Sequence, residues 1–465
     1  MKKTAIESET PAESYKNSRE ARKEATRQRI LEAARSVFVR HPFQSASLRM
    51  IGDAAGVKHP LIIHYFGSKT SLFERIAQDL EAEVLSNLPH LVQVIEGRGP
   101  GESFMLFLRL MLEYSFRRPD AFKAIMLNVG ETSNLKIALP GLGRMAEIRR
   151  KILNLLSKDV FGVSFQGSDD MFFFVYILCI ANFVGASEFH AKALGLPHES
   201  PEYRQWTGDM FEFLFMPAME AIAKGNPPPV SSLIKECSKK DSMFDRVYLW
   251  KTEAMELERS QKANKREAAR SMILEAARHV FSQNPYDTAS IRMIGKQGKF
   301  DHTLIRHYFP TKADLFEAAA EDVFNEFIQA ARMWGFGLEG RPFPQALTIY
   351  LDRTLTYCFQ HREALGILMH NMAHAEQFVD LDGFAYVARL HPQIYDMVLS
   401  LLPVDAPDRD LRMWLYTLIT VLYTFAGAPE YPARLLGMDP TSESYRQWVL
   451  KTLISIFLSV FSKKS

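Results

Sequence analysis

The chain carries one 45-residue pattern twice, and this repeat limits its fold more than any other feature. Residues 30–74 align with residues 273–317 without a gap at an offset of 243, and 25 of the 45 positions are identical. The match resumes where "YSFRRPDAFKAIMLN" from Tyr114 meets "YCFQHREALGILMHN" from Tyr357, and again near the end of each half at an offset of 242. Each repeat is about 200 residues long, far beyond the period of a solenoid. The sequence therefore predicts two fused copies of one complete protein.

Length and composition indicate a multidomain globular chain without a strong global field. At 465 residues the chain has the length of two to four ordinary domains. Hydrophobic residues make up 47% and charged residues 24%, and the net charge is only +2. Any surface for nucleic acid must therefore be local.

Several kinds of site and location are not supported by the sequence. Cys179, Cys237 and Cys358 are far apart and lack metal-type spacing, which argues against a disulfide framework or zinc site and suits a reducing cytoplasm. The N-terminal segment has no apolar run, so we do not expect a secretory signal. The longest uncharged run, Met171–Ser187, is shorter than a membrane span and predicts a buried helix. No metal, cofactor or catalytic pair is expected, and the expected location is cytoplasmic.

Both copies of the repeat have the pattern of three short helices. Ile30, Ala33, Ala34, Val37 and Phe38 follow the spacing of one buried helical face, and the second copy repeats it from Ile273. Prolines then break the chain. Ser47 and Ser290 are expected to cap a second helix, and Gly56 can supply the left-handed residue that ends it in the first copy. Thr311 and Asp314 are spaced like a capping box for the helix after the repeat's third one.

The third helix of each copy has a buried face and an outer polar face. Ile62, Tyr65 and Phe66 share the inner face, as do their counterparts Ile305, Tyr308 and Phe309. The residues left outside are His59, Pro60, Ile63 and His64 in the first copy, and His302, Thr303, Arg306 and His307 in the second. Two short helices around a tight turn, the second with such an outer face, have the geometry that enters a major groove.

The pattern Ile51-Gly52-x-x-Ala55-Gly56-Val57, followed by Ile62-x-x-Tyr65-Phe66-x-x-Lys69-x-x-Leu72, resembles the DNA-binding domain of TetR-type transcriptional regulators. The resemblance covers roughly 27–80 and 270–323 and implies an all-α fold. It implies two tandem units, each a helix-turn-helix domain plus a helical domain for ligand binding and dimerisation. The DNA contacts expected on this basis are Ser47, Arg49, Lys58, His59, Pro60, Ile63, His64, Tyr65, Lys69, Ser290, Arg292, His302, Thr303, Arg306, His307, Tyr308 and Lys312.

The two copies depart from the family pattern in different ways. The family usually has a small residue at the position of Pro60 and a tyrosine at the position of Ile63, and an exposed isoleucine can instead touch a thymine methyl. Thr303 and Arg306 occupy these positions in the second copy, and both can bond phosphate oxygens. Lys299 replaces the turn glycine there and costs roughly 1 kcal/mol in left-handed geometry, unless the turn shifts by one residue to use Gly298.

Basic residues precede each copy and are expected to contact phosphates or a minor groove; solvated helical faces are the alternative. They are Arg19, Arg22, Lys23, Arg27 and Arg29, and Arg259, Lys262, Lys265, Arg266 and Arg270. The expected domains are a flexible basic arm (1–24), a first helix-turn-helix module (25–75), a first ligand and dimerisation domain (76–225), a linker with a helical connector (226–259), a second module (260–318) and a second ligand domain (319–465).

The segments after each module predict packing helices and a dimer bundle. Phe172–Val184 and Leu411–Phe425 are rich in large apolar side chains, and Tyr203–Pro217 and Tyr445–Phe461 supply one amphipathic helix per half. The resemblance implies that these helices form a four-helix bundle inside one chain, as a pseudo-twofold dimer. Further homo-oligomers are also open. Polar residues on apolar helices are candidates for orienting a mainly hydrophobic effector, or for satisfied core and rim residues: Arg109, Glu113, Tyr114, Arg353 and Tyr357.

The function expected from these features is repression of transcription at a double-stranded DNA operator, relieved by a small effector. Because the two outer faces differ, the operator need not be palindromic. A ligand-sensing scaffold with one or both modules unable to grip DNA is the alternative, as is an activator. Neither a membrane nor a catalytic reaction is expected.

Overall fold

The computed structural model describes residues 11–129, 150–151, 169–224, 228–238, 265–372, 394–395, 398 and 407–464, and all regular structure in these ranges is helical. The helices of the first half are α1 (Pro11–Phe38), α2 (Leu48–Ala55), α3 (His59–Phe66), α4 (Lys69–Ile95), α5 (Pro100–Arg117), α6 (Pro119–Val129), α8 (Asp169–Ile180), the π-helical η2 (Ala181–Gly185), α9 (Ser187–Leu194), α10 (Pro201–Ala223) and α11 (Val230–Ser238). The helices of the second half are α13 (Lys265–Gln283), α14 (Ile291–Gly298), α15 (His302–Tyr308), α16 (Lys312–Trp334), α17 (Phe343–Gln360), α18 (Arg362–Met372), α20 (Asp408–Gly427), α21 (Glu430–Leu436), α22 (Glu443–Phe457) and the 3₁₀ helix η4 (Ser459–Lys464). The predicted all-α tandem fold is confirmed.

The caps expected in the two modules are present. Ser47 accepts a hydrogen bond from the backbone N–H of Met50 at 3.2 Å, and Ser290 accepts one from Met293 at 3.3 Å. Each serine thereby satisfies one of the N–H groups that the first turn of a helix leaves unpaired. Thr311 and Asp314 form the predicted capping box.

The first helix starts earlier than the expected domain boundary. Helix α1 begins at Pro11, so residues 11–24 are helical rather than part of a flexible arm. No glycine or proline lies between Ala12 and His41, and Glu24 pairs with Gln28 one turn away, which favours continuation of the helix. The connector expected after residue 240 lies mostly outside the described residues.

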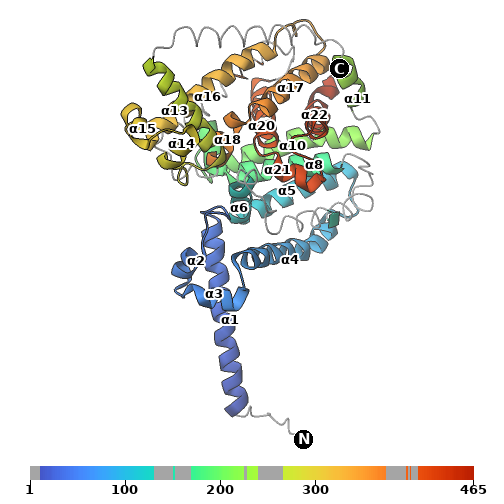
Figure 1. Ribbon diagram of the computed structural model, residues 1–465. Coiled ribbons are helices and arrows are strands. Elements are labelled where there is room, and N and C mark those ends of the chain that lie inside the picture. Colours follow the sequence, from blue (N-terminus) through green and yellow to red (C-terminus); the bar gives the residue numbers. More distant parts are fainter. Residues whose placement is uncertain are drawn as a thin grey trace.

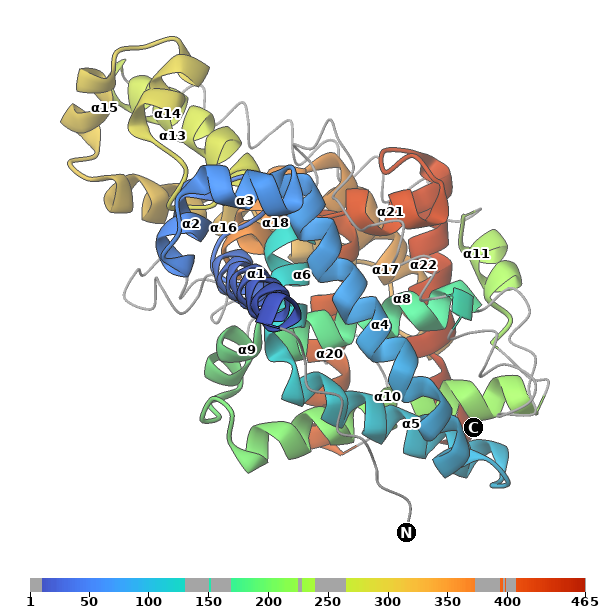
Figure 2. The same ribbon diagram turned by 90° about the horizontal axis from the view of Figure 1, so that it is seen from below.

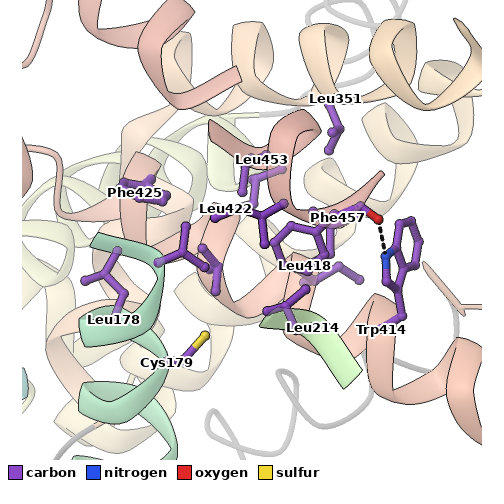
Figure 3. Packing of buried hydrophobic residues seen from close by; sticks show 14 of the residues in the cluster. Leu178, Cys179, Leu214, Leu351, Trp414, Leu418, Leu422, Phe425, Leu453 and Phe457 are labelled. Atoms are coloured by element: carbon purple, nitrogen blue, oxygen red, sulfur yellow. Dashed lines mark hydrogen bonds between the residues drawn. The ribbon is translucent and has the colours of Figure 1, made fainter. Parts of the chain in front are cut away.

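The two halves share one hydrophobic core. Figure 3 shows Leu214 of the first half beside Leu418 of the second, and Leu178 and Cys179 belong to the same cluster of buried side chains. The indole Nε1 of Trp414 donates to the carbonyl of Phe457 at 3.0 Å, so this large buried side chain has its polar group satisfied. The run Met171–Ser187 lies mainly in α8 and η2, and its residues from Phe174 to Val184 are largely buried.

Helices α8 and α10 pack against α20 and α22, which makes the predicted four-helix bundle within one chain. Residues 171–206 and 413–448 align without a gap at an offset of 242, so contacts in the bundle can be compared with their counterparts. Trp206 contacts Tyr416 edge-on at 5.9 Å, and the equivalent pair Trp448 and Phe174 does so at 5.6 Å. The repetition of a contact with the halves exchanged is the mark of a pseudo-twofold axis.

The two modules are attached to the rest of the molecule differently. In Figure 1, α1, α2 and α3 stand below the other helices, with α4 leading upward, whereas α13, α14 and α15 lie against the side. Figure 2 shows the same three helices of the second module at one corner of the molecule. Helix α13 packs along α18, and among the described residues α1 has no comparable packing on α6, its counterpart pairing.

A glycine explains the close approach in the second half. A side chain at Gly366 of α18 would place its Cβ 2.5 Å from the carbonyl oxygen of Ser282, which lies in the last turn of α13. The repeat puts Lys123 and Val39 at the equivalent positions of the first half. These two residues instead line a pocket of about 210 Å³. The first half therefore has a lysine and a pocket at the positions where the second half has this close backbone approach.

Candidate nucleic-acid interface

The outer face predicted for α3 is exposed. Ile62 is fully buried and anchors the helix, while the opposite face is open to solvent. The exposed residues at this face are Lys58, His59, Pro60, Leu61, Ile63 and His64. Ile63 retains 45% of its accessible surface, a large fraction for an isoleucine, and Leu61 retains 37%. The first face is therefore mixed, with two imidazoles beside an apolar ridge.

The equivalent face of α15 is exposed and more polar. Ile305 anchors this helix, and the open residues are His302, Thr303, Leu304, Arg306 and His307. Asp301 caps the helix by accepting a hydrogen bond from the Thr303 N–H at 2.7 Å. Hydrogen bonding from the Thr303 side chain, and then from its backbone N–H, lowers the pKa of the Asp301 carboxyl. A carboxylate therefore stands in the second module where Lys58 stands in the first.

Asp301, Leu61 and Leu304 were not among the residues predicted for the interface. A carboxylate can accept from the exocyclic amine of cytosine, and leucine can contact a thymine methyl. Asp301 was detectable as the N-cap position before His302. The exposure of Leu61 and Leu304 depends on how the other helices of each module pack around them. Helical periodicity does not predict that packing.

Glycines hold the two helices of each module close together. A Cβ at Gly52 would lie 2.7 Å from the carbonyl oxygen of Val57, and a Cβ at Gly295 would lie 2.8 Å from that of Phe300. Both contacts are with backbone, so a larger residue would force the turn away from the first helix of the pair. The tight approach sets the orientation of α3 and α15.

The turn of the second module does not shift. Lys299 itself adopts the left-handed conformation, with φ of 59° and ψ of 38°, closely matching Gly56 at 63° and 36°. Gly298 instead makes room for the ring of Phe300, because a Cβ at this position would lie 1.9 Å from that ring. The first copy has Ala55 and Val57 at these positions, so the larger ring and the missing methyl compensate each other.

Replacing Lys299 with glycine is expected to stabilise the second module by about 1 kcal/mol, because glycine adopts left-handed geometry without the Cβ clash. Hydrogen exchange of the α14 amides measures this change locally. The matched substitution Gly56→Lys should destabilise α2 by a similar amount. Equal protection of α14 in Lys299→Gly and the parent protein would show that the lysine is not strained.

Lys69 and Lys312 are engaged inside the modules. The Nζ of Lys69 donates to the carbonyls of Phe43, Gln44 and Ala46 at 2.7, 3.2 and 2.8 Å. Lys312 Nζ likewise donates to three carbonyls of its own module, at 2.7, 3.5 and 3.1 Å, and both ammonium groups lie over an aromatic ring. This arrangement gives the two lysines a structural role, which is to hold the loop before the second helix of each module.

The remaining predicted contacts divide between support and surface. Ser47 and Ser290 act as caps, while Arg49 and Arg292 are exposed beside them. The rings of Tyr65 and Tyr308 are half-buried and pack edge-on against the neighbouring histidine, at 5.5 and 5.3 Å.

Two of the basic residues before the modules contact aromatic rings inside the modules. The guanidinium of Arg27 lies over the ring of Phe66 at 5.6 Å, and that of Arg270 over Phe309 at 5.2 Å. Such cation–π contacts join each first helix to its third. Exposed basic side chains are Arg19, Arg22, Lys23, Arg29 and Arg266. Arg259 and Lys262 lie outside the described residues, and Lys265 begins α13.

The five polar residues suggested for an effector do not meet at one site. Glu113 and Tyr114 line a pocket of about 260 Å³ between α4 and α5, whereas Arg109 is exposed and pairs with Glu212. The Tyr114 hydroxyl donates to Glu83 at 3.2 Å. Burial, and then the nearby Glu83 charge, raise the pKa of Tyr114 to about 12.

The second-half residues of this set have structural roles. Arg353 is buried and donates to the carbonyls of Trp334 and Phe336, both at 2.8 Å, which fixes the end of α16. The buried ring of Tyr357 stacks on His361 at 4.3 Å, and burial lowers the pKa of this histidine. These contacts engage the guanidinium of Arg353 and the ring of Tyr357 within the second half.

The pocket between α4 and α5 is mainly apolar. Its walls are Val84, Asn87, Leu88, His90, Leu91 and Val94 from α4, and Leu110, Met111, Glu113, Tyr114 and Arg117 from α5. Pro89 lies inside α4 at this level, where α16 has Arg332. Proline removes a helical hydrogen bond, so α4 is locally weaker than its counterpart beside this pocket.

No helix in the described part of the chain combines the length and hydropathy of a membrane span; two sharply bent pairs, α8–η2 with α9 and α20 with α21, reach these limits only jointly.

Comparison with known proteins agrees with the geometry of both modules. The family model described as "Bacterial regulatory proteins, tetR family" matches residues 30–76 and again 273–319. The HTH-type transcriptional repressor AcnR of Corynebacterium efficiens is 32% identical over 103 residues, which is 21% of this chain and 55% of the repressor. The protein of the same name from Corynebacterium glutamicum is 34% identical over 104 residues, with the same shares. The chain thus matches about half the length of these curated relatives. Both halves therefore carry a match to the model of the tetR family of bacterial regulatory proteins, on a duplicated all-α fold.

Proposed function

We propose that the chain is a transcriptional repressor that binds one operator with two unequal modules. The observation that carries this proposal is the pair of exposed outer faces on α3 and α15. The two helices have equivalent buried residues, Ile62 and Ile305, but different exposed side chains. The printed names of the relatives, which are repressors, support the direction of regulation. Two such helices on one molecule enter successive major grooves when their separation is about 34 to 36 Å.

The two faces favour different half-sites. The first face offers Pro60, Leu61 and Ile63, whose apolar surface suits thymine methyl groups. The second face offers Arg306, which can pair with guanine or with a phosphate, and Asp301, which can accept from cytosine. An operator for this chain therefore has one half richer in A·T pairs and one richer in G·C pairs.

Changing one face at a time tests DNA binding. Arg306→Ala is expected to lower specific affinity by about 1 to 3 kcal/mol if the guanidinium contacts a base, and to reduce the salt slope by about 1 if it contacts a phosphate. The double variant His59→Ala, His64→Ala should weaken the other half-site. Binding is measured by fluorescence anisotropy at several salt concentrations, on DNA recovered by selection from random sequence.

The control is Arg332→Ala, an exposed arginine on α16 far along the chain from the α15 face. Unchanged affinity and salt slope in the variants of both modules, equal to those of this control, would rule out DNA binding by either face. Selection of strict palindromes would instead refute the unequal half-sites.

We further propose that a small, mainly hydrophobic effector binds between α4 and α5 and relieves repression. The apolar walls and the polar rim of this pocket suit such a ligand. Helix α4 begins in the first module, so a ligand that prefers one position of α4 also prefers one position of α3. Operator affinity then falls by the difference in ligand affinity between the two positions.

A ligand-sensing scaffold is the second candidate. The exposed Leu61 and Ile63 favour it, because an apolar ridge on a recognition helix also suits a protein partner. The turn at Lys299 gives it no support, since this turn keeps the geometry of the first module. The binding series above separates the candidates, as a scaffold would show no salt-dependent loss with any module variant.

A further inference from the structure

The four-helix bundle contains polar contacts that are not repeated when the halves are exchanged. The edge-on pairs Trp206–Tyr416 and Trp448–Phe174, which join the two halves, obey the pseudo-twofold symmetry. These symmetric contacts would form equally well between any two halves. Partner choice must therefore depend on the contacts that break the symmetry.

The pseudo-twofold axis passes beside Asn182 and Thr424. These residues occupy equivalent positions, 242 residues apart, and the Asn182 Nδ2 donates to the Thr424 Oγ1 at 3.1 Å. Both side chains are buried. A residue that contacts its own counterpart lies at the axis, so this amide and hydroxyl mark the point where identical halves would place two identical side chains.

A buried hydrogen bond between the halves has no counterpart at the symmetry-related positions. His190 Nδ1 lies 2.8 Å from the Tyr416 hydroxyl, and both residues are buried. The equivalent position of Tyr416 in the first half is Phe174, and that of His190 in the second half is Pro432. Two first halves would place each imidazole against a phenylalanine, and two second halves would place each hydroxyl against a proline.

An ion pair at the bundle surface discriminates through repulsion. Arg409 Nη2 lies 2.6 Å from Asp209 Oδ2, between α20 and α10. The counterpart of Asp209 in the second half is Lys451. In a pair of second halves Arg409 would therefore face a lysine. Like charges in contact are unfavourable, and partner choice in helical assemblies commonly uses such repulsion.

We infer that the bundle face of each half is specific for the other half and rejects a copy of itself. The partner that this surface accepts is the complementary half, carrying Tyr416 and Arg409 opposite His190 and Asp209. An unpaired buried hydrogen-bonding group costs enough to lower association about tenfold or more, and each mismatched pair creates two. This inference concerns chain pairing alone and stands whether or not the modules bind DNA.

A cleavable full-length chain tests the inference. A protease site is inserted between residues 239 and 264, the purified protein is cut, and the two fragments are unfolded in urea and refolded together. Native mass spectrometry then counts the three pairings, which differ in mass. We expect the mixed pair to exceed each like pair at least about tenfold. Statistical amounts of the like pairs would overturn the inference.

Charge reversal in the uncut chain provides an independent measurement. Asp209→Arg and Arg409→Asp should each lower the urea midpoint, and the double variant should recover most of the loss, as expected for directly coupled charges. Additive losses in the double variant would overturn the role of this pair. The matched control, made in the cleavable chain, is reversal of Asp408 and Arg412, an ion pair inside α20 of one half, which should leave the proportions of the three pairings unchanged.

Discussion

Replacing Arg278 with alanine is expected to loosen the second module by about 3 kcal/mol. This arginine lies on α13, keeps 19% of its side chain exposed and contacts Asp322 at 2.9 Å and Glu326 at 2.7 Å, with Glu363 of α18 at 3.9 Å. Burial opposes its charge, but hydrogen bonds and the charges of Glu326 and Asp322 prevail and raise its pKa. Without it, the carboxylates of Asp322, Glu326 and Glu363 would face one another where α13 packs on α16 and α18.

The first half supplies the matched control. Arg35 is the equivalent residue, but it is more exposed, and among the described residues its ion pair is with Asp79, which also pairs with Arg75. Arg35→Ala should cost about 1 kcal/mol or less, as for an ordinary surface pair. Hydrogen exchange in α13 and α1 measures both changes. Equal losses in the two variants would contradict a special role for Arg278.

Lys69→Met and Lys312→Met are expected to destabilise their modules by about 3 kcal/mol each. Methionine keeps much of the apolar stem but leaves three carbonyls without their charged donor, and hydrogen bonds to charged groups contribute about 1.5 to 3 kcal/mol. The loops at Phe43 and Tyr286 should lose protection from exchange first. Operator binding should fall because α2 and α3, or α14 and α15, lose their mutual orientation.

A salt titration distinguishes this structural role from a phosphate contact. A lysine that neutralises a phosphate contributes about 0.9 to the slope of log affinity against log salt concentration. The Met variants should lose thermal stability without DNA, whereas Arg306→Ala should keep it. Unchanged stability and a reduced salt slope in Lys69→Met would contradict the structural role and indicate that the lysine contacts a phosphate.

Local features of the modules were predictable from the sequence because their causes are local. The buried face from Ile30 to Phe38 follows from helical spacing, and the caps at Ser47 and Thr311 follow from side chains within three residues of the N–H groups they satisfy. The left-handed turn at Gly56 belongs to the same class. The four-helix bundle was predicted from the family resemblance and the duplicated apolar segments.

Features that depend on contacts between distant segments were not predictable in this way. Lys69 fits a phosphate contact by type and position, and only the three-dimensional course of residues 43–46 shows where its ammonium lies. Gly298 suggests a shifted turn until the ring of Phe300 is placed. Arg353 and Tyr357 align with pocket residues of the first half. In the second half, however, the Arg353 guanidinium donates to the end of α16, and the Tyr357 ring stacks on His361.

The joining of both bundle partners in one chain also has a consequence for how the protein responds to its own abundance. A two-chain regulator separates on dilution, so the amount of its active form rises with roughly the square of chain concentration when chains are scarce. Here α8 and α10 meet α20 and α22 at an effective concentration fixed by the connector. The active form should therefore rise in direct proportion to synthesis, and each new chain should be competent from the moment it folds, even at a few copies per cell.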